Sequence, residues 1–162
     1  MARRYWLMKS EPSAYSIDDL KRDETTLWDG VRNYQARNLM REMKVGDQAL
    51  FYHSNAEPPA VVGIQEVSGL AEPDATQFDS SDSHFDPKAT PANPIWYGVR
   101  VKFKKKFVRP VMLPEIREHR GLQNMVLLNR SRLSVQPVTE KEFKIISDLG
   151  SSKASAKGKT RG

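Results

Sequence analysis

Residues 96–108 read WYGVRVKFKKKFV, and this stretch decides the fold class. Val99, Val101 and Phe103 alternate with charged residues such as Lys102. Successive side chains of a β-strand point to opposite faces of the sheet, so this alternation predicts a long strand with one buried and one solvated face.

Shorter predicted elements lie on both sides of this strand. Ser16 with Asp19, and Thr139 with Glu142, form capping boxes that predict helix starts, and Gly150 is expected to end the last helix. Further strands are predicted over residues 5–8, 48–53, 60–70 and 132–138, and helices from about residue 17 and over 34–43, 113–120 and 140–149. Because strands and helices do not alternate regularly, we expect an α+β fold, a small mixed β-barrel flanked by short helices.

Two segments lack a predicted element. Residues 72–93 are long, polar and rich in proline, as is typical of functional or disordered loops. Residues 151–162 contain no large apolar side chain and are expected to form a disordered basic tail behind a single domain over residues 1–150.

Composition restricts the chemistry. The chain has no cysteine, which excludes disulfides and thiolate metal sites, and its three histidines have no ligand-like spacing, so we expect neither metal nor cofactor. Four of the six net positive charges lie in the tail, which leaves residues 1–150 only mildly basic. Any affinity of the domain for nucleic acid is therefore expected from local patches. The short apolar run near Met1 predicts neither a signal peptide nor a membrane span. A cytoplasmic location is expected, with association with the nucleoid as an alternative and a nuclear location if the source is a eukaryote.

Two motifs concentrate side chains that suit a nucleobase. Residues 28–38, WDGVRNYQARN, combine aromatic, arginine and asparagine side chains around a glycine turn, and residues 51–55, FYHSN, end a predicted strand. Aromatic rings stack on bases, amides and hydroxyls read base edges, and arginines hold phosphates. These motifs indicate a base-binding pocket rather than a catalytic site.

Four blocks of sequence carry a family resemblance. Residues 5–12 (YWLMKSEP), 28–34 (WDGVRNY), 51–54 (FYHS) and 132–138 (RLSVQPV) resemble, in this order, the signature blocks of the EVE-domain family, which belongs to the PUA-like superfamily of small barrels. The resemblance covers residues 3–149. It implies a reader of modified bases, of the 5-methyl- or 5-hydroxymethylcytosine class in DNA, with modified RNA as an alternative.

A more distant likeness to YTH domains, which hold methyladenine in an aromatic cage, implies individual roles. Lys9 and Ser10 resemble a Lys-Ser pair at the end of the first strand, Trp28 resembles a cage tryptophan, and Ser131 with Arg132 resembles a phosphate-binding pair. The second aromatic wall is open among three candidates, Phe85, Trp96 and Tyr97.

These observations predict a site with two groups of residues. The base pocket is expected to comprise Ser10, Trp28, Asn33, Tyr34, Tyr52, His53, Ser54 and Trp96. Phosphate contacts are expected from Lys9, Arg32, Arg37, Lys104, Lys105, Lys106, Arg130 and Arg132.

Structural roles compete with the binding roles for several of these residues. Asn33 could cap the following helix, and His53 could be a hydrogen-bonded structural histidine. Trp28 could be packing alone, and the basic run 102–109 could be an edge strand whose lysines prevent aggregation.

The sequence therefore predicts a non-enzymatic reader of a modified base in DNA or RNA, with a partner protein as the source of any nuclease activity. An RNA-binding module in RNA modification or tRNA metabolism is a second hypothesis. An enzyme acting on a modified nucleoside, with Glu11, Asp29 and His53 as candidate catalytic groups, is a third, and a protein-interaction module is a fourth.

Overall fold

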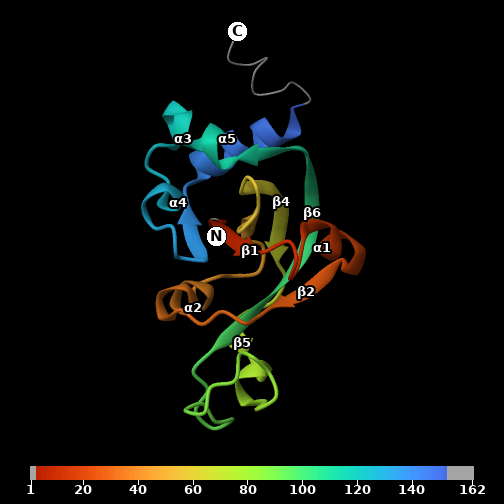
Figure 1. Cartoon of the computed structure of the whole chain (residues 1–162), viewed down its shortest axis with the longest axis vertical. Helices are drawn as coiled ribbons and strands as arrows, with labels where there is room; N and C mark the ends of the chain where they lie inside the picture. The colour runs from red at the N-terminus through yellow and green to blue at the C-terminus, as the bar shows by residue number, and fades with distance from the viewer. Residues whose placement is uncertain (1–2, 153–162) are drawn as a thin grey trace.

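The computed structural model describes residues 3–152 and shows an α+β fold built on one mixed, seven-stranded sheet (Figure 1). The strands are β1 (Tyr5–Ser10), β2 (Thr25–Trp28), β3 (Gln48–His53), β4 (Ala60–Val67), β5 (Glu72–Pro73), β6 (Tyr97–Met112) and β7 (Val135–Val138). Their order is β2-β6-β4-β3-β1-β7, and β5 pairs with β6. The β1–β3 pair is parallel, and the remaining pairs are antiparallel.

The expected α+β class is confirmed, but the sheet does not close into a hydrogen-bonded barrel. β2 and β7 lie at opposite ends of the strand order and do not pair. Helix α2 (Tyr34–Met40) contacts both β7 and β6, so a helix covers the gap between the two ends of the sheet.

Three of the five α-helices within residues 3–152 begin at a side-chain cap. α1 (Ile17–Asp23) and α5 (Glu140–Ser151) start at the predicted capping boxes, which are both formed. The other helices are α3 (Leu113–Glu118) and α4 (Val126–Asn129), with 3-10 turns at Ala75–Phe78 and Arg120–Leu122. β2 and α4 were not among the predicted elements, because neither exceeds four residues.

The sheet is buried on both faces, which one-sided alternation did not predict. In β3, Phe51 belongs to a core cluster with Trp6, Met8 and Trp28, whereas Tyr52 faces a second cluster beneath α5. The central strands therefore separate two hydrophobic cores, and the cluster around Phe51 forms the floor of the site described below.

Only part of the basic run 102–109 lies at an edge of the sheet. It belongs to β6, which lies between β2 and β4 in the sheet. β2 pairs with β6 only over Val99–Lys102, whereas β4 follows β6 as far as Met112.

The last helix runs past its predicted end. Gly150 does not stop α5; it is buried inside it, and a Cβ there would lie 2.2 Å from the Phe107 ring. Ser151 is the last residue of α5, so the helix enters the segment expected to be a tail. The rest of that expected tail, residues 153–162, lies outside the described residues.

The long polar loop 72–93 is organised around one buried side chain. The Gln77 amide donates to the carbonyls of Asp74 and Trp96 and accepts the backbone N–H groups of Ile95 and Trp96. This network joins the loop to the start of β6. The loop in turn places His84 near the end of β2.

Candidate nucleic-acid interface

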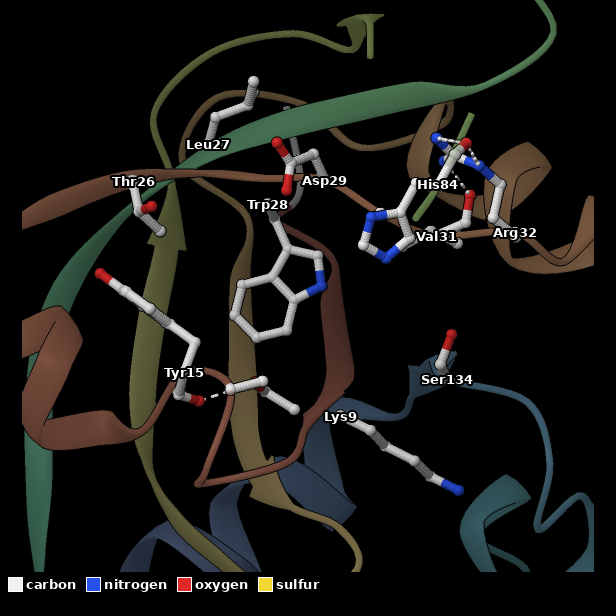
Figure 2. A pocket seen from close by; sticks show the side chains of 13 residues that line it. Lys9, Tyr15, Thr26, Leu27, Trp28, Asp29, Val31, Arg32, His84 and Ser134 are labelled. Carbon is white, nitrogen blue, oxygen red and sulfur yellow. Dashed lines mark hydrogen bonds between the residues drawn. The ribbon is translucent and has the colours of Figure 1, made fainter. Parts of the chain in front are cut away.

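A cavity of about 450 Å³ opens where β1, α1, β2 and the turn after β2 meet (Figure 2). Its lining comes from five separate segments of the chain. The lining residues are Lys9, Ser10, Ala14, Tyr15, Thr26, Leu27, Trp28, Asp29, Gly30, Val31, Arg32, His84 and Ser134.

Trp28 forms a wall of this cavity at the end of β2. Only 8% of its surface is exposed, and its ring packs edge-on against Phe51 with centroids 5.3 Å apart and an interplanar angle of 85°. The tryptophan is therefore both a core residue and a cavity residue, so the packing and binding interpretations of its role are compatible.

The turn after Trp28 is held by a buried carboxylate. Gly30 has a φ of +78°, which favours glycine, and its N–H donates to Asp74 Oδ2 at 2.7 Å. The Asp74 side chain also accepts bonds from Arg32 and Thr76. Burial alone would raise the pKa of Asp74, but these hydrogen bonds outweigh it and hold the pKa below its ordinary value.

His84 reaches the cavity from the polar loop. Its carbonyl accepts Arg32 Nε–H at 2.9 Å and Nη2–H at 2.8 Å, and its Nδ1 lies 2.9 Å from Asp82 Oδ1. A Cβ on Gly30 would lie 3.0 Å from His84 Nε2, so the glycine makes room for this ring. Figure 2 shows the imidazole beside Asp29 and Val31.

The opposite side of the cavity is built by the end of β1. Ser10 Oγ donates to the carbonyl of Tyr15 at 2.7 Å, which positions the segment before α1. Lys9 Nζ donates to the carbonyl of Ser131 at 2.6 Å, and burial lowers the pKa of this lysine. This bond anchors the segment that contains Arg132 and the lining residue Ser134.

Of the predicted pocket residues, Ser10 and Trp28 line the cavity and the other six do not. Asn33 caps α2 by accepting the N–H of Ala36 at 2.8 Å, so the structural alternative holds for it. Tyr34 is 58% exposed and stacks outside the cavity on Trp96, whose indole N–H donates to Asp86.

The three predicted residues at the end of β3 serve the fold. Tyr52 is buried in the second core. His53 Nε2 accepts the N–H of Ile17 at 3.1 Å, and burial lowers the pKa of this histidine. The backbone N–H of Ser54 donates to the Ser10 carbonyl. The tertiary partners Ile17 and Ser10 could not be recognised from the local motif.

Most of the predicted phosphate contacts are engaged within the protein. All five N–H donors of Arg32 are used by the carbonyls of Val31 and His84, by Asp74 and by Thr76, so a phosphate role does not fit this residue.

The remaining residues predicted to contact phosphate differ in whether their side chains already have partners within the protein. Arg37 bonds Ile95 and Asn38, Arg130 bonds Gln35, Lys104 lies near Glu66, Lys105 bonds Ser151 and Lys106 bonds Asp18. Arg132 is exposed and makes no hydrogen bond or ion pair within residues 3–152. It is thus the basic residue of the predicted set best placed to meet a phosphate.

Several lining residues were absent from the predicted pocket. The position of Asp29 at the cavity could have been inferred, because it follows Trp28 in the turn. Tyr15 and His84 are brought to the cavity by the tertiary structure alone. Tyr15 is the second aromatic ring at the cavity, and none of Phe85, Trp96 and Tyr97 lines it.

Asp29 gives the cavity a carboxylate at its rim. Although the residue is exposed, desolvation raises the pKa of its carboxyl group, and the charge of Asp74 adds to this effect. Of the three candidate catalytic groups, Asp29 lines the cavity and Glu11 and His53 do not.

Two further features are absent from residues 3–152. No group of three or more histidine or acidic side chains is arranged to hold a metal ion there. No helix in that range is long and apolar enough to cross a membrane.

Comparison with known proteins identifies the family. The EVE domain model matches residues 4–149. Human thymocyte nuclear protein 1 is 43% identical over 164 residues, which cover 90% of this chain and 73% of that protein. The Gallus gallus protein of the same name is 44% identical, over 90% of this chain and 68% of that protein.

Solved structures share the fold at similar identity. A hypothetical protein from Leishmania major superposes with a TM-score of 0.90 at 48% identity, covering 92% of this chain and 95% of that chain. Human THYN1 protein, solved in complex with 5-methylcytosine-containing DNA, superposes with a TM-score of 0.88 at 41% identity, covering 93% of this chain and 99% of that chain. The chain therefore belongs to the EVE-domain family.

Proposed function

We propose that this protein binds DNA that contains 5-methylcytosine, and that the modified base enters the cavity beside Trp28. The observation that carries the proposal is the similarity to human THYN1, a relative whose structure was solved with 5-methylcytosine-containing DNA. A cavity of about 450 Å³ also lies in the size range of small-ligand pockets.

A base in duplex DNA reaches such a cavity only after it leaves the stack. Extrusion costs a few kcal/mol, which contacts inside the pocket must offset. Trp28 and Tyr15 supply apolar walls, and Ser10, Asp29 and His84 supply polar groups. Arg132, which lies outside the cavity, also supports the proposal. It precedes the lining residue Ser134 by two positions, and its guanidinium is free to contact a phosphate.

The proposed role is binding without bond breaking. The lining holds one carboxylate, that of Asp29, and one imidazole, that of His84, whose Nδ1 is paired with Asp82, and it holds no pair of carboxylates for acid–base catalysis. A partner protein that supplies a nuclease, and the cytoplasmic location, stay predictions.

A binding titration at about 50 mM salt, where phosphate contacts are strong, tests this function. Matched oligonucleotides carry cytosine, 5-methylcytosine or 5-hydroxymethylcytosine at one position, as DNA and as RNA. Tighter binding to methylated DNA than to its plain counterpart is expected. Equal binding to all oligonucleotides would contradict the proposal, and a preference confined to RNA would move the function to the second hypothesis.

A further inference from the structure

The indole N–H of Trp28 is a hydrogen-bond donor left without a partner. The Trp6 indole donates to Asp47 at 3.0 Å and the Trp96 indole to Asp86 at 2.8 Å. Trp28 is also more than nine-tenths buried, yet its Nε1 has no partner within residues 3–152. The nitrogen is not among the fully enclosed polar atoms, so it is accessible from the cavity that the residue lines.

A free acceptor adjoins this donor. Within the described chain, the Asp29 carboxylate receives a hydrogen bond only from its own backbone N–H. Both residues line the cavity, and in Figure 2 the indole nitrogen is on the edge of Trp28 that faces His84, while the Asp29 carboxylate lies above the same side chain. Desolvation raises the pKa of Asp29, and a hydrogen bond from a ligand donor would favour its ionised form.

We propose that this donor–acceptor pair selects a 4-aminopyrimidine: the Asp29 carboxylate accepts a hydrogen bond from the exocyclic amino group, and the Trp28 N–H donates to the O2 carbonyl of the ring. The inference rests on the proposed function and names the base edge that is read. The Trp28 ring is a wall of the cavity, and its N–H adds a polar contact point to that wall.

Thymine is the informative competitor, because it carries the same 5-methyl group as 5-methylcytosine. Where cytosine has an amino donor, thymine has the O4 acceptor. An ionised carboxylate is an acceptor only, so thymine would leave Asp29 unpaired and opposed to a second acceptor. Both bases keep the O2 carbonyl, so the Trp28 donor does not distinguish them.

The test compares four duplexes that differ at one pair: 5-methylcytosine·guanine, cytosine·guanine, thymine·guanine and thymine·adenine. We expect the protein to bind 5-methylcytosine·guanine at least about tenfold more tightly than either thymine duplex, since leaving a charged group unpaired costs at least the corresponding ~1.4 kcal/mol. The thymine·guanine mismatch opens more easily than a matched pair, so ease of extrusion works against this result.

Two variants assign the selectivity to its residues. Asp29→Asn offers an N–H as well as a carbonyl, and its preference for 5-methylcytosine over thymine is expected to fall to within about threefold. Trp28→Phe keeps an aromatic wall but loses the N–H, and it is expected to weaken binding of all four duplexes by a similar factor. Trp96→Phe is the matched control, because that indole N–H is already paired with Asp86 outside the cavity.

The outcomes distinguish a failure of the proposed base-edge recognition from a failure of the proposed 5-methylcytosine binding. Equal affinity for 5-methylcytosine and cytosine would overturn the proposed function. A preference for 5-methylcytosine over cytosine combined with equal affinity for the thymine duplexes would overturn this inference alone. Unchanged selectivity in Asp29→Asn, with melting temperature retained, would also overturn it.

Discussion

Arg32 and Asp74, forty-two residues apart, form a salt bridge of 3.0 Å in which the aspartate side chain is completely buried. The same carboxylate oxygen accepts the Gly30 N–H, and the same guanidinium holds the His84 carbonyl. One ion pair therefore joins the turn after β2 to the polar loop, and both segments line the cavity.

Arg32→Ala is expected to lower the free energy of unfolding substantially. Removal of one partner leaves the buried Asp74 carboxylate undercompensated, which typically costs about 3–5 kcal/mol. Urea unfolding measures the loss. The control is Arg37→Ala, whose guanidinium hydrogen-bonds the Ile95 carbonyl and the Asn38 side chain, lies over the Tyr34 ring and has no acidic partner within residues 3–152. Equal stabilities of the two variants would show that the Arg32–Asp74 pair does not hold the loop.

His53 is expected to make stability fall in mild acid. Because Nε2 accepts the Ile17 N–H, protonation destroys that bond, and burial holds the folded-state pKa below the ordinary 6.5. The unfolded chain therefore takes up the proton first, so this contribution is complete above pH 6.5 and is lost as the pH falls toward the folded-state pKa.

The measurement is the free energy of unfolding between pH 7.5 and 5.5, for the wild type and for His53→Gln. The wild type should lose more stability than the variant over this range, because only it carries the titrating ring at position 53. Parallel pH profiles would show that the His53 ring does not cause the loss of stability.

Local sequence patterns correctly predicted the features that depend on interactions between residues close in sequence. The capping boxes at Ser16 and Thr139 and the strand over residues 48–53 form as expected, because each depends on neighbours in sequence. Gly150 was misassigned as a helix stop because its buried contact with Phe107 comes from β6, a distant strand.

The site was predicted only in part for the same reason. Trp28 was identified because an aromatic side chain stands out in its motif, and Ser10 because the Lys9–Ser10 pair resembles one in YTH domains. Four of the five N–H donors of Arg32 are used by residues more than forty positions away, which no local pattern reveals. His84 could not be placed, because its position depends on the Gln77 network that folds the polar loop.

Arg132→Ala is expected to weaken binding to methylated and plain DNA by the same factor. If the exposed guanidinium neutralises one phosphate, the slope of log K against log salt should decrease in magnitude by about 0.9. Titrations at several salt concentrations measure this slope. Lys144→Ala is the control, since Lys144 lies on α5, outside the cavity lining, where it pairs with Asp148. A loss confined to methylated DNA would place Arg132 in base recognition instead.

Asp29→Asn is expected to retain or raise the melting temperature at neutral pH. The pKa of Asp29 is raised in the folded protein by desolvation and by Asp74, so the folded state binds this proton more tightly than the unfolded chain does. Its ionisation therefore disfavours folding as the pH rises through the folded-state pKa, and a neutral amide removes that penalty. Differential scanning calorimetry at pH 7 measures the change. A marked decrease in melting temperature would mean that the carboxylate is structural, whereas a stable variant with altered base selectivity would show that the fold carries this charge for binding.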